Sequence, residues 1–449
     1  MRRLAGSMII SLLFVAGCGD DDGPAPGADA GITADGGVFA DGGAAMMTIR
    51  RRALADAPTA AARTPLEGVR VAFDLDSVRY EGVSDASGNV DVVMPRAATI
   101  PAATFAKERY TIITRIDGPG VPVGASGVSD RLDVVMYPTT PAADVRVTVN
   151  ATGVPAGGRW CAGLAEWYSA CVAEGTSVDV RLPEDSFRGR TTGIALDATG
   201  AVVDFAEAPL AGTGAADRTA TIAFDATPAV APMTRTVTLR MPADAASVWR
   251  TTALLEPDEA RPFIAAEPTT HLLRSVVTGR MRATDATSYS MTVTWFPAPG
   301  APPVWAMFAY AAPGGDAFAY RWFAGAVDQP SYSLLDGPRI TGRPAMGVYT
   351  FPYSWAAVPG AERYTLQLVN NAGTVVWTVS IPATTGVQLP ALPTGYDPTV
   401  SFPFEGANGY AQVRALVGTA PDPAAAMAGT DPYLVDAQVT SGPREPITF

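Results

Sequence analysis

The sequence predicts an all-β chain, built as tandem β-sandwiches that follow a disordered linker. Two observations predict this fold class. Apolar residues recur at every second position in many short segments, which is the period of a strand with one buried face. Turn residues such as Asp, Asn and Gly separate these segments in the rhythm of sandwich domains. A length of 449 residues corresponds to about three domains, or four short sandwiches.

Residues 1–17 form a predicted signal peptide. Arg2 and Arg3 start it, an apolar run covers residues 8–15, and small residues precede Cys18. The run is too short for a membrane span, which needs about 20 residues. Val15-Ala16-Gly17-Cys18 resembles the lipobox of bacterial lipoprotein precursors. That resemblance implies cleavage before Cys18, lipidation of its thiol and acylation of the new amino terminus. The alternative is an ordinary secretory signal with an incidental cysteine.

The lipobox resemblance sets the expected location and one expected partner. A lipid-bearing Cys18 binds the membrane, because several acyl chains anchor a protein stably where one chain holds it only marginally. We therefore expect a cell-envelope protein at the outer membrane, on its periplasmic face or at the cell surface. The net charge of −12 argues against a nucleic-acid partner, since an acidic surface repels phosphates.

Residues 18–62 are predicted to be a disordered acidic linker that carries the lipidated Cys18. Repeated Asp and Gly, as in Ala34-Asp35-Gly36-Gly37, leave too few apolar residues for a core. The aspartates lack the alternating spacing of a calcium loop. Arg50-Arg51-Arg52 near the end of the linker is expected to be solvated, and contact with anionic lipid is the alternative.

The first predicted sandwich covers residues 63–140. Val69, Val71, Phe73 and Leu75 alternate with polar or small residues, and a turn at residues 85–89 leads to a second strand. Another strand pair is predicted at residues 110–116 and 132–137. The stretches 65–71 and 84–88 resemble carboxypeptidase-regulatory-like and bacterial immunoglobulin-like sandwiches. These modules are accessory or structural, so the resemblance implies no active site.

The second predicted sandwich covers residues 141–232 and contains Cys161 and Cys171. If Cys18 carries lipid, these two cysteines remain as a pair. In an oxidising envelope we expect them to form a disulfide, worth about 2.5–3 kcal/mol. Two buried free thiols are the alternative. The aromatic loop around them, with Trp167, is either a contact surface or a plug at one end of the core.

A third β domain is predicted over residues 233–342, as a degenerate fibronectin type III-like copy. It holds His271, the only histidine, so one chain cannot assemble a histidine metal site or more than one Ser-His-Asp triad. No G-x-S-x-G motif supports such a triad. We assign no catalytic residue, no metal and no cofactor. Trp305 and Trp322 are the candidate ligand-binding residues, since exposed indoles stack on sugar rings.

The fourth domain, residues 343–449, resembles a fibronectin type III domain. Trp355 would be the core tryptophan of its second strand, Tyr364 would belong to the third, and residues 409–415 would form the penultimate strand. In residues 409–415 the apolar set falls on Ala411, Val413 and Ala415, so Tyr410 is expected to point outward. Residues 295–334 repeat the spacing of residues 355–389, which suggests a second copy or a chance similarity.

Three functions remain open from the sequence. The first is a non-catalytic envelope lipoprotein whose β modules bind a glycan or an envelope protein. The second is a glycan hydrolase that uses a carboxylate pair such as Glu184 and Asp185, although neighbouring residues on a strand point to opposite faces. The third is a structural spacer. We select the first as the working hypothesis.

Overall fold

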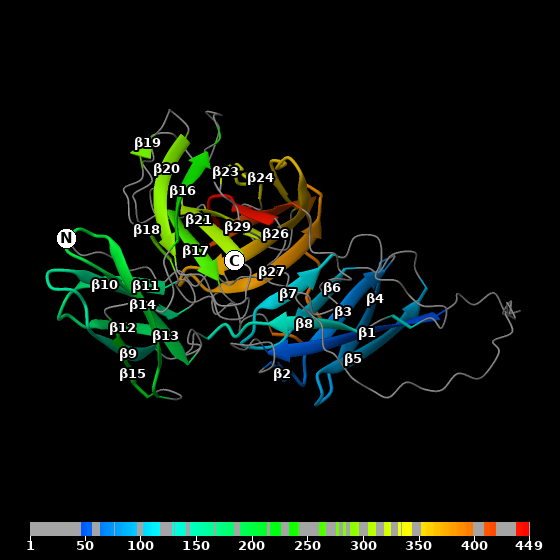
Figure 1. Ribbon diagram of the computed structural model, residues 1–449. Helices are drawn as coiled ribbons and strands as arrows, with labels where there is room; N and C mark the ends of the chain where they lie inside the picture. Colours follow the sequence, from blue (N-terminus) through cyan, green and yellow to red (C-terminus); the bar gives the residue numbers. More distant parts are fainter. Residues whose placement is uncertain are drawn as a thin grey trace, which may run out of the picture.

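A computed structural model gives the structure of the chain (Figure 1). All secondary structure in the described residues is β strand, with no helix, which confirms the predicted all-β class. The described residues are 46–55, 63–75, 77–96, 102–116, 128–129, 131–140, 144–165, 168–183, 189–212, 216–225, 233–240, 242, 260–265, 275–277, 282–283, 288–295, 304–310, 318–324, 331–333, 335–343, 352–397, 408–418 and 437–448.

Module 1, residues 46–140, is a sandwich of two sheets. One sheet has the order β5-β1-β8, with β2 also beside β1, and the other has the order β4-β3-β6-β7. Val71, Phe73 and Phe105 from the second sheet pack on Ile49 and Val92 from the first. The strands are β1 (Met46–Ala55), β2 (Thr64–Pro65), β3 (Arg70–Leu75), β4 (Val78–Val83), β5 (Asn89–Pro95), β6 (Ala103–Ala106), β7 (Ile112–Arg115) and β8 (Leu132–Met136).

Strand β1 corrects the predicted linker, which was expected to run from residue 18 to residue 62. Met46–Ala55 is a strand, and it lies between β5 and β8 in the centre of its sheet. Arg51, expected to be solvated, is 1% exposed, and its guanidinium lies 5.8 Å from the ring centre of Phe73. An arginine at an inward position interrupts the apolar alternation of Ile49 and Ala53, so the period-2 signal of this strand was missed.

Module 2, residues 144–225, has two facing sheets ordered β11-β10-β13-β14 and β12-β9-β15. Trp160 lies in the core between them, edge to face with Phe224. The strands are β9 (Asp144–Thr152), β10 (Arg159–Ala165), β11 (Tyr168–Ala173), β12 (Val178–Pro183), β13 (Arg190–Leu196), β14 (Val202–Pro209) and β15 (Arg218–Ala223).

Modules 1 and 2 share one strand order. In each, the first strand pairs antiparallel with a middle strand and parallel with the last strand, as β1 does with β5 and β8 and as β9 does with β12 and β15. The opposite sheets match as well, since β4-β3-β6-β7 corresponds to β11-β10-β13-β14. The structure therefore contains a repeat of topology that sequence spacing did not predict.

Module 3, residues 233–333, follows the same plan in part, because its strands β18 and β19 pair with β20 in the first sheet and not with β17 in the second. Its first strand β16 pairs antiparallel with β20 and parallel with β23, and β17, β21 and β22 form the second sheet. The strands are β16 (Met233–Arg240), β17 (Ala260–Ala265), β18 (Ser275–Val277), β19 (Arg282–Ala283), β20 (Ser288–Trp295), β21 (Val304–Tyr310), β22 (Phe318–Ala324) and β23 (Ser331–Ser333).

Module 4, residues 335–448, has a different order. Its sheets are β24-β25-β28 and β27-β26-β29, with β30 and β31 along the outer edge of β29. Trp355 is 3% exposed in the core, where it contacts Tyr364, and Tyr410 is 38% exposed. The strands are β24 (Ile340–Gly342), β25 (Tyr353–Trp355), β26 (Ala361–Asn370), β27 (Val375–Pro382), β28 (Gly386–Val387), β29 (Asn408–Gly418), β30 (Ala437–Ser441) and β31 (Glu445–Thr448).

The two tryptophans that suggested a sequence repeat occupy different strand positions. Trp295 ends β20, which pairs with β16 along its whole length. Trp355 ends β25, which pairs with β24 and β28. The similar spacing of residues 295–334 and 355–389 is therefore not matched by a common strand order.

Candidate functional site

The most extensive contact between modules joins the last module to the first and the third. One twelve-stranded sheet runs from β17 to β4 and contains strands from modules 1, 3 and 4. Strand β27 pairs parallel with β7, and β30 pairs antiparallel with β22. Module 4 thus lies between modules 1 and 3, and the orange strand β27 runs beside the cyan strand β7 (Figure 1).

A buried hydrogen-bond chain lies at the β7–β27 junction. The indole Nε1 of Trp377 donates to the hydroxyl of Thr114 at 3.0 Å, and this hydroxyl is also bonded to that of Thr104 at 3.0 Å. Ile112 and Ala106 from module 1 belong to the same apolar cluster as the core of module 4. The two modules therefore share one interior at this junction, and the buried indole N–H of Trp377 has its hydrogen-bond partner inside it.

Arg79 on β4 holds the loop that follows β28. Its guanidinium makes a two-fold hydrogen bond to Asp74, at 2.8 and 2.9 Å, and donates to the carbonyls of Leu392 at 2.7 Å and Ala391 at 3.0 Å. The hydrogen bond to Asp74 raises the pKa of Arg79. The fork of guanidinium donors suits this combination of one carboxylate and two carbonyls.

Two further hydrogen bonds fix the same loop. The backbone N–H of Thr394 donates to Glu81 at 2.8 Å, and Arg70 donates to the carbonyl of Thr394 at 3.2 Å. Two arginines and one glutamate on β3 and β4 thus form hydrogen bonds to the backbone of this loop in module 4. The chemistry of this region is that of a structural interface.

The matching edge of module 2 is built differently. Strand β14 occupies the place of β7 and β22, and no described strand pairs with its outer side. Asp204 accepts the N–H of Phe205 at 2.7 Å and that of Asp225 at 2.7 Å, and Pro209 has no N–H. Hydrogen bonds to the Asp204 side chain and the missing N–H of Pro209 both disfavour pairing with a further strand. The edge of β14 is thus protected by its own side chains, whereas β7 and β22 are covered by strands of module 4.

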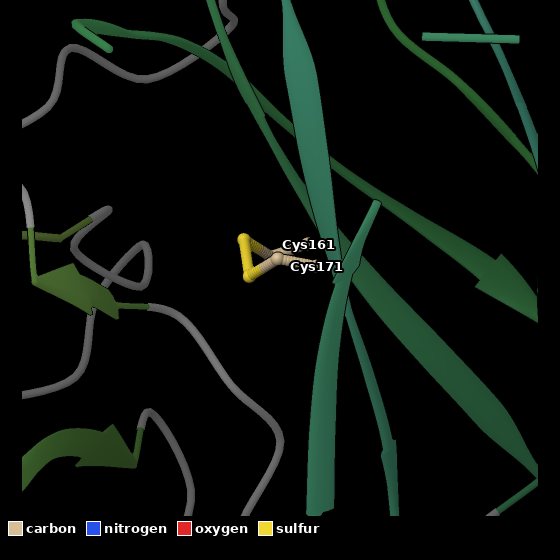
Figure 2. Close-up of a disulfide and its surroundings, with 2 residues drawn as sticks. All are labelled: Cys161 and Cys171. Carbon is tan, nitrogen blue, oxygen red and sulfur yellow. A yellow bond between two sulfur atoms is a disulfide. The ribbon is translucent and has the colours of Figure 1, made fainter. Parts of the chain in front are cut away.

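The two cysteines of module 2 are bonded to each other, with an S–S distance of 2.02 Å. Cys161 on β10 lies directly opposite Cys171 on β11, and both sulfurs project from the same face of the strand pair (Figure 2). Trp160 and Ala162, the neighbours of Cys161, face the core, so the disulfide lies on the other face of the sheet. Cys161 is 1% exposed, and Cys171 is exposed.

The two candidate ligand-binding tryptophans lie on adjacent strands of module 3. Trp305 on β21 is opposite Phe323, whereas Trp322 on β22 is opposite Ala306, so the two are one step out of register. Trp322 is also aligned with Ala437 of β30, at the junction with module 4. Their role in ligand binding stays a prediction.

The other sequence candidates lie outside the described residues: Cys18, Trp167, Glu184, Asp185 and His271. Among the described residues, no group of three or more His, Cys, Asp or Glu side chains is placed to hold a metal ion. The described part of the chain also has no helix long and apolar enough to cross a membrane.

No protein-family model and no curated protein matches the sequence. Solved structures with similarity include the Bacillus anthracis TIE protein, at 9% identity and a TM-score of 0.16, covering 64% of this chain and 50% of that one. Two B repeat units of the Staphylococcus aureus collagen binding protein match at 10% identity and a TM-score of 0.13, covering 78% of this chain and 91% of that one. A Ca2+-stabilized adhesin that helps an Antarctic bacterium bind ice matches at 11% identity and a TM-score of 0.16, covering 89% of this chain and 98% of that one. This chain thus spans half the length of the TIE structure. TM-scores this low carry no information on function.

Proposed function

We propose that the protein is a lipid-anchored, non-catalytic envelope protein whose β-rich head binds a glycan or an envelope protein. The lipobox at residues 15–18 supports the anchor, and the acidic stretch that ends before β1 supplies a spacer from the membrane. The outer membrane is the proposed site, on its periplasmic face or at the cell surface.

The observation that carries the binding proposal is the continuous sheet through modules 1, 3 and 4. Modules joined only by linkers would move independently, whereas strand pairing and the buried Trp377–Thr114 bond hold these three in one arrangement. A fixed arrangement presents its surfaces preorganised, which lowers the entropic cost of binding. The same rigidity suits a structural spacer, which is the competing function.

Module 4 is proposed to be of the fibronectin type III kind. Supporting this assignment, its second strand carries the core residue Trp355, and its third strand carries Tyr364. The hydroxyl of Tyr364 accepts the N–H of Val358 at 2.8 Å in the buried interior. An alternative β-sandwich type would place the same residues in the core.

A binding screen with residues 44–449 tests the proposed function. The fragment must include β1, because this strand is central to its sheet. We expect specific capture on a glycan array or from an envelope-protein pull-down. Capture that is lost in Trp305→Ala or Trp322→Ala would place the ligand on module 3. Recovery of nothing specific by a folded fragment would overturn the binding proposal in favour of the spacer.

A further inference from the structure

We propose that the outer face of the β5-β1-β8 sheet in module 1 is a membrane-docking surface, which binds the phosphate headgroups of the leaflet that holds the lipid anchor. This face combines arginines with exposed apolar side chains, and it follows directly after the acidic stretch that leads from Cys18. The surface rests on the proposed anchor at Cys18 and adds to it an orientation of the head on the membrane.

Strand β1 places two of its three arginines on the outer face. Arg51 is buried in the core, so Arg50 and Arg52, one position before and after it, point outward. The side chain of Arg50 is exposed, and its guanidinium lies 3.6 Å from the carboxylate of Asp91 on β5. An ion pair this exposed contributes little, so a phosphate competes readily with Asp91 for the Arg50 guanidinium.

Two further arginines lie beside them, around Asp133. Arg52 is aligned with Asp133 on β8, and Arg131 precedes Asp133 by two positions, which is the spacing of one strand face. Arg63 comes directly before β2, which pairs with the end of β1. Burial raises the pKa of Asp133, and the charges of these three arginines lower it, so all three lie near this carboxyl. Neither Arg52 nor Arg131 makes a hydrogen bond from its side chain to another described residue.

The balance of charge on this face is opposite to that of the chain. Four arginines lie beside two aspartates here, whereas the whole chain has a net charge of −12. Guanidinium groups suit phosphate because they bind it through two parallel hydrogen bonds. An anionic lipid surface therefore attracts this face and repels the acidic remainder of the protein, which gives the head one preferred orientation.

Apolar side chains extend the face toward the start of β1. Met46 on β1 and Val93 on β5 are both exposed. They lie on the outer face, since their neighbours Met47 and Val92 are buried in the core. Basic and apolar side chains together on one face are typical of surfaces that bind the headgroup region of a bilayer.

The distance from the anchor also favours docking of this face. Residues 19–45 connect Cys18 to β1, and a flexible chain of that length has a root-mean-square span of about 30 Å. Such a tether gives an effective concentration of roughly millimolar, so weak binding to headgroups is sufficient. The β5-β1-β8 sheet is the layer of module 1 that does not join module 4, so docking leaves module 4 turned away from the membrane (Figure 1).

Vesicle binding by a recombinant chain of residues 18–449 with Cys18→Ala tests the surface without the anchor. Co-sedimentation at low salt should recover this chain with vesicles of phosphatidylcholine and phosphatidylglycerol, and not with phosphatidylcholine alone. Arg52→Gln/Arg131→Gln should weaken binding about tenfold or more. The matched control, Arg159→Gln/Arg181→Gln, removes two exposed arginines of module 2 and should change binding less than about twofold. Equal losses in the two double variants, equal binding to the two kinds of vesicle, or binding to neither kind would overturn the proposal.

Two single substitutions test the face with little risk to the fold. Asp133→Asn removes a negative charge from the face and should strengthen vesicle binding several-fold. Val93→Asn should weaken binding, and Val83→Asn, at an equally exposed valine on β4 in the other sheet, is the control. Unchanged binding in Asp133→Asn and Val93→Asn would contradict the proposed face, even where the arginine variants fail to fold.

The acidic stretch itself is the competing occupant of the face. Residues 19–45 contain aspartates and neither lysine nor arginine. Vesicle binding that appears only when these aspartates are replaced by asparagine would show that the stretch covers the arginines, and it would overturn membrane docking. Because the assayed chain carries no lipid, absence of lipid from Cys18 in the cell would leave all these results unchanged, and a failure of the anchor is thereby distinguished from a failure of the surface.

Discussion

Trp377 in the last module donates its indole N–H to Thr114 in the first module, across 263 positions of sequence and inside a buried interior. The bond lies where β7 and β27 pair. The indole N–H of Trp377 in module 4 therefore has its hydrogen-bond acceptor in module 1. Modules 1 and 4 are consequently expected to unfold together.

Thr114→Val tests this dependence. Valine keeps the shape of threonine but removes the acceptor of the Trp377 N–H and the partner of Thr104. We expect a loss of about 1–3 kcal/mol in the free energy of unfolding, measured by urea denaturation. Thr221→Val, at an exposed position on β15, is the control and should change stability by less than about 0.5 kcal/mol.

The double variant with Trp377→Phe makes the measurement specific to the pair. Once the indole N–H is gone, Thr114→Val should cost clearly less than it does in the native chain. Additive losses would show that the two residues stabilise their modules separately. Unfolding transitions that no longer coincide when followed by tryptophan fluorescence and by circular dichroism would show that modules 1 and 4 unfold separately.

Removal of β1 is expected to abolish the fold of module 1. A fragment that starts at residue 63 lacks β1, which is paired on one side with β5 and on the other with β8. It also loses buried Met47 and Ile49. Because modules 1 and 4 are expected to unfold together, thermal unfolding of residues 63–449 should show a strongly lowered midpoint for their shared transition relative to residues 44–449. Identical melting curves would contradict a structural role for β1.

Much of the fold follows from period 2 in the sequence. The alternation at Val69, Val71 and Phe73 predicted β3, and all three are buried. The turn predicted at residues 85–89 forms because the carboxylate of Asp85 accepts the N–H groups of Ser87 and Asn89. These elements depend on local patterns, which a single sequence contains.

The features that sequence did not predict depend on distant contacts. Arg51 is buried because β5 and β8 flank its strand and Phe73 lies under its guanidinium, and none of these partners is adjacent in sequence. The pairing of β7 with β27 also has no local signal in the sequence. Side chains alternate with period 2 in an edge strand and in a central strand alike, so the pattern does not show whether another strand pairs beside it. The candidate site was therefore not predictable as a junction, although its strands were.

Two glutamines that face each other across β26 and β29 should respond oppositely to the same substitution. Gln367 is 0% exposed, and neither the nitrogen nor the oxygen of its amide has a hydrogen-bonding partner among the residues that the structure describes. Gln412 beside it donates to the carbonyl of Gly442 at 3.0 Å. Gln367→Met should raise the free energy of unfolding by about 1–3 kcal/mol, and Gln412→Met should lower it. A loss of stability in both would show that the Gln367 amide is satisfied in solution.

The pH dependence of stability is expected to change in opposite senses at two aspartates. Partial burial raises the pKa of Asp133 and outweighs the attraction of Arg52, whereas the hydrogen bond from Arg146 lowers the pKa of Asp179. The folded chain holds the Asp133 proton more tightly than the unfolded chain, so stability falls as pH rises above the ordinary aspartate value of about 3.9. For Asp179 stability is instead lost as pH falls below that value.

The melting temperatures of two asparagine variants check these signs. Asp133→Asn should melt above the native chain at pH 7 and converge with it near pH 3, where an aspartate is largely neutral. Asp179→Asn should melt slightly below the native chain at pH 7, since the pair with Arg146 is exposed, and converge with it at acidic pH. Shifts of the same sign in both variants would contradict the assigned causes.

Lipidation of Cys18 is the prediction on which the proposed location depends. Cys18→Ala removes the thiol that the lipobox pattern predicts to be modified, and several acyl chains are lost with it. We expect the variant to leave the membrane fraction and to incorporate no labelled palmitate. A Cys161→Ala/Cys171→Ala variant is the matched control, since it removes the disulfide and should keep both the label and the membrane association. Palmitate in the Cys18→Ala protein would show that the anchor lies elsewhere, and equal loss of label in the control would trace the effect to misfolding.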